Sequence, residues 1–316
     1  MYWMFGALWG YSSSGRGQSG VGDLLLIGLA GFGAVLGLIV TCTSSWRKAA
    51  AYGLLIALAL FLVAPFVWMI LVSLHPSKSP IPPLADIIPA KPAWNNYDFV
   101  LNHETLPVGR FFINSLIVTL SCVISQLFVS SLAAYGFARI RFNGREPLFY
   151  LFLGSMMFAG PVTQIPVFLF LKNLGWLDTY AALIVPGMSS AFSVFLLRQF
   201  FMQIPAELDE AARIDGAGDF HIYARVVMPL SKAALATCAA FSFFGVWTDF
   251  FNPLIFTNST EMRTLEVGLS IFKNSYGGTN WPLQMTAAVI VMTPLLIVFL
   301  FTQRYFTKGI TLGSIK

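Results

Sequence analysis

The stretch EAARIDG at residues 210–216, followed by VVMP at residues 226–229, is a polar interruption of a strongly apolar chain. Long uncharged segments lie before and after it. A glycine at 216 and a proline at 229 divide it into two short helical stretches. The pattern predicts a compact helix–turn–helix loop that lies in water and contacts a partner surface.

The first short helix has the expected chemistry at both ends. Pro205 suits its first position, where the missing N–H costs nothing. Glu207, Asp209 and Glu210 lie in its first turn, where the helix dipole favours negative charge. Gly216 can take the positive φ that ends a helix and turns the chain sharply.

The i, i+3, i+4, i+7 spacing places four residues on one face of this helix: Leu208, Ala211, Ala212 and Asp215. The two alanines would let this face approach another surface closely. A second short helix is expected over residues 219–228, with Pro229 as its stop. The whole loop spans about residues 203–230.

The composition predicts an all-α polytopic membrane protein. The chain is 57% hydrophobic and only 10% charged, with a mean hydropathy of +0.73. Soluble domains are about a quarter charged. Several uncharged runs reach the roughly 20 residues that a membrane-spanning helix needs. The expected spans are 49–73, 111–138, 147–170, 181–200, 232–258 and 284–303.

Residues 24–43 form a further uncharged, glycine-containing run. Its length predicts an extra N-terminal transmembrane helix, with an interfacial helix as the alternative. A cleaved signal peptide is not indicated, because Arg47 and Lys48 follow the apolar run instead of preceding it.

The pI is near 9.2, but the basic residues are spread over the loops in the way expected of a membrane protein. With six spans, the loops on the side of Glu210 hold twice as many Lys and Arg as the opposite loops, which places that side in the cytoplasm. The basic residues form no patch, so nucleic acid is not an expected partner. Arg139 and Lys232 are interpreted as interfacial charges that snorkel.

No catalytic or metal site is predicted. Cys42, Cys122 and Cys238 fall in apolar runs without metal-ligand spacing, and the three histidines are scattered. The sequence has no Walker-type phosphate loop. The chain is therefore not expected to be an enzyme or to bind a cofactor, and any ATP with its Mg²⁺ would be used by a partner.

The loop resembles the EAA loop of binding-protein-dependent ABC importer permeases. Val226 and Met228 replace the usual Ile and Leu, which are volume-conserving exchanges. Other matches are to carbohydrate-uptake permeases, with the smaller permease of maltose-type importers the most similar: AAYGFAR at 133–139, the lead-in FFMQIPAELD at 200–209, WTDFFNPL at 247–254 with Thr248 for the usual Asn, and the tail QRYFTKG at 303–309.

The resemblance implies a six-helix permease domain over 49–316, with residues 1–48 as an N-terminal extension outside it. It implies a multi-pass permease of the bacterial inner membrane that imports a carbohydrate: a sugar, oligosaccharide, polyol or glycoside. The implied partners are a second homologous permease, an ABC ATPase dimer, an extracytoplasmic solute-binding protein and membrane lipid. The implied ATPase-coupling residues are Glu207, Glu210, Ala211, Ala212, Asp215, Gly216 and Pro229.

Polar residues within the spans are candidates for a solute path: Gln126, Gln164, Trp247, Asp249 and Asn252. Asp249 is flanked on both sides by long apolar runs, and an intramembrane carboxylate is a functional candidate. The alternative is that Asp249 bonds neighbouring backbone at the break before Pro253. For Gln126 and Gln164, hydrogen bonds between helices are an equal alternative.

Two other functions use the same spans. One is an ABC importer permease for a non-sugar solute. The other is an ion-coupled secondary transporter, which should carry buried ion pairs or a proton relay. A requirement for ATP and an external binding protein would separate the second from an importer.

Overall fold

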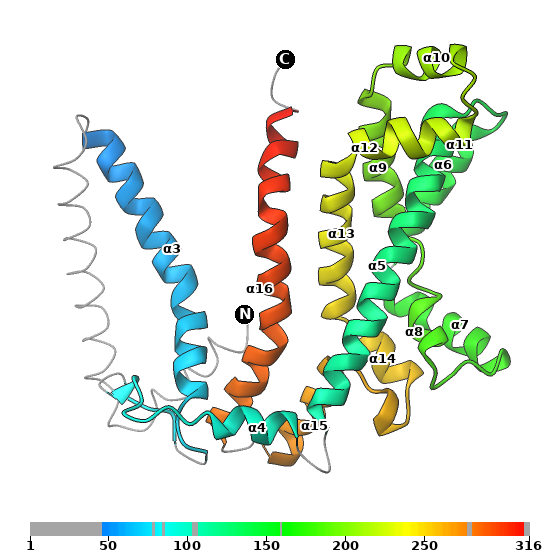
Figure 1. The fold of residues 1–316 in the computed structure, drawn as a ribbon. Coiled ribbons are helices and arrows are strands. Elements are labelled where there is room, and N and C mark those ends of the chain that lie inside the picture. Colours follow the sequence, from blue (N-terminus) through cyan, green and yellow to red (C-terminus); the bar gives the residue numbers. More distant parts are fainter. Residues whose placement is uncertain are drawn as a thin grey trace. The chain divides into compact units, whose positions relative to one another are not determined.

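The computed structural model describes residues 46–77, 80–83, 86–102, 107–158, 160–276 and 280–312, and this part of the chain is helical (Figure 1). The helix expected over 24–43 lies outside the described residues. Contacts divide the chain into two units, one within residues 1–100 and 273–289 and the other within 101–272 and 290–316.

The helices have the following bounds: α3 Trp46–Ser73, α4 Asn95–Leu101, α5 Val108–Arg139, α6 Arg145–Gly154, α7 Gly160–Asn173, α8 Tyr180–Ile184, α9 Ala191–Gln203, α10 Glu207–Ile214, α11 Asp219–Ile222, α12 Met228–Leu230, α13 Lys232–Trp247, α14 Phe251–Phe256, α15 Leu265–Tyr276 and α16 Trp281–Leu312. Short 3₁₀ turns cover Ser155–Met157 and Thr260–Met262, and a π-helical segment covers Tyr223–Val227.

Within the described residues, three helical stretches are long and apolar enough to cross a membrane: Ala51–Ser73, Val108–Arg139 and Trp281–Gln303. Up to five segments qualify if two bent helix pairs each count as one span. Three of the expected spans therefore form as continuous helices, and the other three are interrupted.

The span expected over 147–170 bends by 100° between Met157 and Gly160. The span expected over 181–200 is broken after α8 at Pro186 and Gly187, and Ser190 then caps α9 by accepting a hydrogen bond from the Ser193 N–H at 3.3 Å. These breaks occur where glycine and proline weaken the helical hydrogen-bond ladder.

The span expected over 232–258 also ends early, because α13 stops at Trp247 and α14 begins at Phe251. Pro253 lies in the first turn of α14, where its missing N–H is tolerated. Broken helices at membrane depth are acceptable where the freed backbone is covered by protein or lines a cavity.

The first unit joins the end of α3 to α4 and to the start of α16. Asn96 Nδ2 donates to the carbonyls of Ser73 and His75 at 2.8 and 2.7 Å. Thr286 Oγ1 donates to the Ser73 carbonyl at 3.2 Å. The last carbonyl of α3, that of Ser73, and the His75 carbonyl just beyond it thus gain side-chain donors in place of the bonds that a helix end loses.

In the second unit, α5 packs along α9 and α13. Figure 1 places α10 and α11 at one end of this unit and α7, α8 and α14 at the other, with α5 running between them. An apolar cluster fills each end. At the α10 end it centres on Phe149, Leu197, Phe201, Ile222 and Tyr223. At the opposite end it centres on Cys122, Leu171, Leu183 and Phe256.

A buried arginine supports the cluster at the α10 end. Arg198 Nη2 contacts both carboxylate oxygens of Glu146, at 2.8 and 3.0 Å, and its Nε donates to the Phe137 carbonyl at 3.2 Å. Its guanidinium also lies 4.0 Å from the centroid of the Phe149 ring. A buried cation that is paired in this way joins α5, α6 and α9.

Candidate functional site

The helix α10 starts with the three expected carboxylates, Glu207, Asp209 and Glu210, in its first turn. The sequence predicts Pro205 at the first position of α10, and this is wrong. The helix begins at Glu207, with Ala206 as its N-cap. Pro205 lies in the linker after α9, where its fixed φ stiffens the connection between the two helices.

The prediction of a positive φ at Gly216 is confirmed, with φ of +84°. Gly216 N–H donates to the Arg213 carbonyl at 3.0 Å and Ala217 N–H donates to the Ala212 carbonyl at 2.9 Å. This pair of bonds is the Schellman motif that closes a helix C-terminus. An exposed ion pair, Arg213 to Asp219 at 2.8 Å, spans the turn.

The second helical stretch runs from Asp219 to Leu230, so Pro229 is not its stop. The residues before Pro229 form the π-helical segment, in which Met228 N–H donates to the Tyr223 carbonyl. The wider turn admits the proline, whose ring would clash in a regular α-helix. The stretch ends at Ser231, whose Oγ donates to the Val227 carbonyl at 2.8 Å.

The two faces of α10 differ. Ala212 packs with Ala217 against the apolar cluster of its own chain. Glu207, Glu210, Ala211, Asp215 and Gly216 are exposed. Of the two alanines expected to approach a partner, only Ala211 points outward.

Large apolar side chains join the exposed residues of this loop. Leu208 is 42% exposed, Phe220 is 70% exposed and Ile214 is 87% exposed. None of these three is needed to fill the core of this chain, and clustered exposed apolar side chains on a polar loop mark an interaction site.

Arg139 has a different role from the snorkelling charge that the sequence suggests. Its side chain is 10% exposed and forms an ion pair with Asp209 at 3.3 Å. It also donates to the carbonyls of Phe201 and Ile204 at 2.8 and 2.6 Å. The end of α5 therefore holds both the end of α9 and the start of α10. Lys232, in contrast, is exposed, as expected of a snorkelling side chain.

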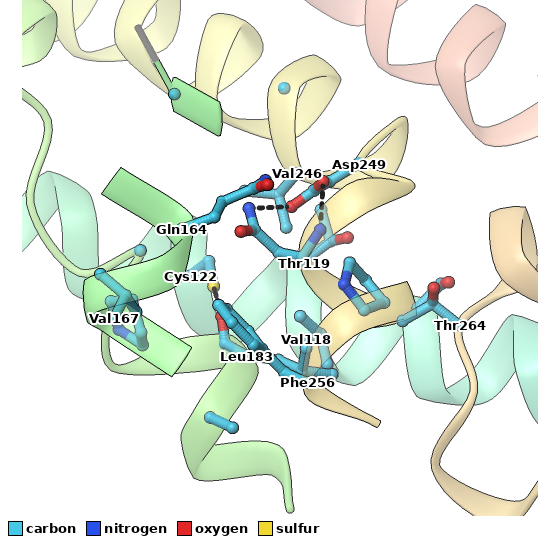
Figure 2. A pocket seen from close by; sticks show the side chains of 18 of the residues that line it. Val118, Thr119, Cys122, Gln164, Val167, Leu183, Val246, Asp249, Phe256 and Thr264 are labelled. Carbon is cyan, nitrogen blue, oxygen red and sulfur yellow. Dashed lines mark hydrogen bonds between the residues drawn. The ribbon is translucent and has the colours of Figure 1, made fainter. Parts of the chain in front are cut away.

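A cavity of about 330 Å³ lies at the opposite end of this unit, among α5, α7, α8, α13 and α14 (Figure 2). Its polar lining side chains are Ser115, Thr119, Thr163, Gln164, Asp249, Asn252 and Thr264. Its volume is within the usual range for small-molecule sites.

Three of the five candidate path residues line this cavity: Gln164 from α7, and Asp249 and Asn252 from the break between α13 and α14. Asp249 accepts from the backbone N–H and the Nδ2 of Asn252, at 3.2 and 2.6 Å. The alternative interpretation, in which Asp249 bonds the backbone before Pro253, describes its contacts, and a solute-path role stays a prediction for a residue that also lines the cavity.

The other two candidates do not line the cavity. Trp247 is 2% exposed, stacks on Phe243 at an interplanar angle of 9°, and donates to the Val291 carbonyl at 3.0 Å. Gln126 accepts from Ser242 and donates to Ser193 Oγ at 3.5 Å, so it joins α5, α9 and α13. For Gln126 the interhelical alternative describes its position.

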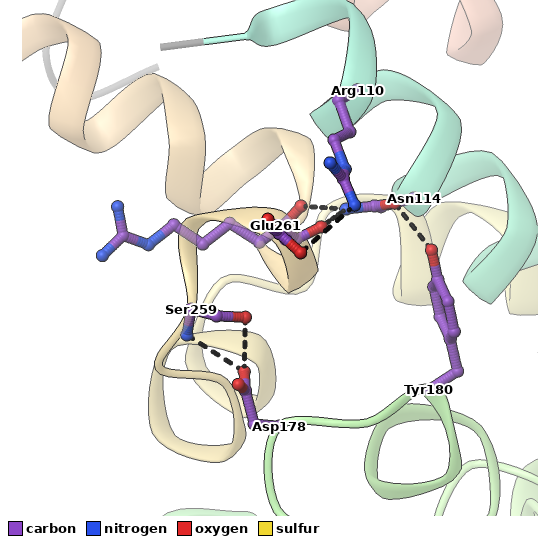
Figure 3. Close-up of polar contacts among 7 residues, drawn as sticks. Arg110, Asn114, Asp178, Tyr180, Ser259 and Glu261 are labelled. Atoms are coloured by element: carbon purple, nitrogen blue, oxygen red, sulfur yellow. Dashed lines mark hydrogen bonds and ion pairs between the residues drawn. The ribbon is translucent and has the colours of Figure 1, made fainter. Parts of the chain in front are cut away.

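The loops at the cavity end are fastened by a second polar group, shown in Figure 3. Asn114 Nδ2 donates to the carbonyls of Glu261 and Arg263, at 2.7 and 2.9 Å, and Tyr180 Oη donates to Asn114 Oδ1 at 2.7 Å. Asp178 Oδ1 accepts from the N–H groups of Asn258 and Ser259, each at 3.0 Å.

The chain matches, over residues 30–312, the family described as "Binding-protein-dependent transport system inner membrane component". The chain belongs to this family. The permease is therefore a multi-pass inner-membrane transport subunit of a binding-protein-dependent ABC importer, and ATP is hydrolysed by partner subunits. The resemblance that the EAA loop suggested is confirmed.

Characterised relatives cover most of the permease. The trehalose/maltose transport system permease protein MalG of Thermococcus litoralis is 35% identical over 83% of this chain and 94% of its own length. The arabinooligosaccharides transport system permease protein AraQ of Bacillus subtilis is 34% identical over 82% and 92%. The sn-glycerol-3-phosphate transport system permease protein UgpE of Yersinia pestis is 33% identical over 81% and 93%.

A solved structure has the same fold. A chain of a bacterial ABC transporter involved in the import of the acidic polysaccharide alginate superposes with a TM-score of 0.70 at 24% identity, over 84% of this chain and 99% of that chain. This likeness shows that the two chains share their fold.

Proposed function

We propose that this permease imports a carbohydrate, as a six-span subunit paired with a second homologous permease and served by an ABC ATPase dimer. The observation that carries the proposal is the exposed α10 loop in a chain whose relatives MalG and AraQ are named for sugar transport. In the six-span arrangement, α3, α5, α6 with α7, α8 with α9, α13 with α14, and α16 are the spans, with 24–43 as an extra N-terminal helix. Residues 49–316 are the permease domain and residues 1–48 the extension.

The ATPase-facing surface in this proposal is the outward face of the loop: Glu207, Glu210, Ala211, Asp215 and Gly216, with Leu208, Ile214 and Phe220 as apolar contacts. Ala212 and Pro229 contribute by shaping the loop. Burial of the three apolar side chains would stabilise docking, and the carboxylates would give it orientation.

The cavity is the proposed point of contact with the solute. Asp249, Asn252 and Gln164 offer the hydrogen-bond acceptors and donors that sugar hydroxyls need, among the apolar walls typical of small-molecule sites. Trp247 and Gln126 would support this site from behind, since neither reaches the cavity.

Purification of the tagged permease in mild detergent, with mass spectrometry of the co-purifying proteins, tests the assembly. We expect a second permease and an ABC ATPase in the same particle. Recovery of the permease alone, from membranes that transport actively, would contradict the proposal.

A phosphorylated polyol is the second candidate solute, because UgpE is named for sn-glycerol-3-phosphate transport. Reconstitution with the binding protein and ATPase, followed by competition between neutral oligosaccharides and glycerol phosphate, separates the two. Family membership sets aside an ion-coupled secondary transporter. Uptake should accordingly continue when the proton gradient is dissipated and ATP is maintained.

A further inference from the structure

The helix α10 has few ties to the rest of its chain. None of its side chains is fully buried. Its apolar contact with the core comes from Ala212, helped by Ala217 after the turn, and an alanine buries little surface. Packing alone therefore fixes the orientation of α10 only weakly. A directional polar contact is needed to fix α10 against the rest of the chain.

The directional contact is the ion pair between Arg139 and Asp209. Both side chains are shielded from solvent, at 10% and 13% exposure, and their nitrogen and oxygen atoms are 3.3 Å apart. Shielded ion pairs are screened much less by salt than exposed ones. The other ion pair of α10, Arg213 to Asp219, has both side chains more than half exposed and contributes little.

Arg139 itself is fixed independently of α10. Its Nη2 donates to the carbonyls of Phe201 and Ile204, at the end of α9, where a helix leaves carbonyls unpaired and its dipole is negative. Loss of the Asp209 carboxylate would leave Arg139 in place and remove only the tie to α10.

The helix that carries Arg139, α5, also reaches the cavity. From Val108 to Arg139, α5 is uninterrupted, and its outer half lines the cavity with Ser115, Val118, Thr119 and Cys122. In the described chain, the bent segments that flank the cavity lack this continuity. A continuous helix moves as a unit, whereas breaks absorb displacement.

We propose that Arg139 and Asp209 are positioning residues whose ion pair makes α10 and the cavity-lining helix α5 move together. The inference rests on the proposed docking of α10 on the ATPase. A push on α10 then passes through Asp209 and Arg139 into α5 and reaches Ser115 and Thr119.

The pair has unused bonding capacity. Arg139 Nε and Asp209 Oδ1 are both buried and have no hydrogen-bond partner among the described residues. A shift of α10 that brings these atoms together would turn the single contact into a two-bond fork, the stronger geometry for arginine and carboxylate.

The test is a reconstituted importer, with ATPase and binding protein, in which solute uptake and ATP hydrolysis are measured together. In Asp209→Asn we expect normal recovery of the ATPase and normal ATP hydrolysis, but solute carried per ATP lowered about fivefold or more, the low end of ordinary coupling between sites. Asp209→Glu keeps the charge and should restore most of the ratio.

Arg198→Gln is the matched control. It removes an equally buried arginine whose polar partners in the described structure, Glu146 and the Phe137 carbonyl, lie outside α10. It should lower the thermal midpoint of the complex and leave solute per ATP unchanged. Arg139→Gln should behave as Asp209→Asn does, and the double variant should be no worse than Arg139→Gln alone, since both remove one interaction.

An unchanged ratio in Asp209→Asn would overturn the inference, as would an equal fall of the ratio in Arg198→Gln. If Arg139→Gln does not assemble, Asp209→Asn decides alone. Failure of the proposed function looks different, because the wild-type permease would then not recruit an ATPase through the loop in the first place.

Discussion

At the scale of single residues, Gly216 shows how a local rule fixes the turn after α10. Its φ of +84° is favourable for glycine and strained for residues with a Cβ, although a Cβ there would meet no neighbour. Substitution therefore strains the turn without a clash in the core.

We expect Gly216→Ala to weaken ATPase association and uptake while the permease remains folded, because the roughly 1–2 kcal/mol of backbone strain is local to the turn. Gly216→Asn should lose less, since Asn tolerates positive φ. Gly218→Ala is the control, because Gly218 has φ of −76° and open space around it. Co-purified ATPase and uptake are measured, and equal behaviour of the two alanine variants would contradict the prediction.

Asp178 is a second residue whose chemistry is local, in the loop between α7 and α8. Partial burial acts to raise the pKa of Asp178, but hydrogen bonds from the Ser259 and Asn258 N–H groups and the Ser259 hydroxyl outweigh it and hold that pKa below its ordinary value. A carboxylate with a depressed pKa stabilises the folded loop at any pH above the ordinary pKa of aspartate. This stabilisation is lost only as the pH falls through the lowered pKa of the folded state.

Between pH 7 and pH 5, hydrogen exchange of the peptide containing Asn258 and Ser259 should show unchanged protection once corrected for intrinsic rates. Asp178→Asn should reduce that protection throughout this range, because the neutral amide is a weaker acceptor. Loss of protection between pH 7 and 5 in the wild type would show that another group fastens the loop.

At the scale of elements, the two glutamines occupy different environments. Gln126 joins α5, α9 and α13, whereas Gln164 lines the cavity. We expect Gln126→Leu to lower stability by about 0.5–2 kcal/mol, the range for hydrogen bonds between membrane helices, with little change in the KM for uptake.

Gln164→Leu should do the reverse, raising the KM with little change in thermal midpoint. Thermal unfolding in detergent and uptake kinetics measure the two effects. If the KM rose in Gln126→Leu and not in Gln164→Leu, the assignment of the solute contact to Gln164 would be wrong.

The elements also show what the sequence can predict. The acidic first turn of α10 and the turn at Gly216 follow local rules, so they were predictable. A break before Pro253 was part of the interpretation of Asp249, but the break at 185–190 was not predicted, because backbone freed inside a membrane span is accommodated by the surrounding folded protein. The role of Arg139 was also hidden, since its carbonyl partners lie 62 and 65 residues away along the chain.

At the scale of the whole molecule, substitution of an exposed apolar side chain of the loop should weaken ATPase binding without lowering the stability of the permease. Ile214 is 87% exposed, so Ile214→Glu removes almost no contact within the chain. The unfolding free energy of the isolated permease should change by no more than about 0.5 kcal/mol, the usual range for surface substitutions, so that its thermal midpoint stays nearly the same.

The same Ile214→Glu variant should recover less ATPase during purification, because a charge would be buried at the docking surface. Measurement of both quantities on one preparation checks this. A lower midpoint together with normal ATPase recovery would place Ile214 inside the permease fold and outside the interface.

The division of α10 into two faces has a consequence for how such importers diversify. Ala212 and Asp209 face their own chain, while Leu208, Ala211 and Ile214 make no demand on the core. Substitutions at the outward positions are nearly neutral for folding. Under the proposed docking of this face on the ATPase, selection or design can therefore change which ATPase the importer accepts, and importers in one cell can share an ATPase or keep separate ones through a handful of side chains.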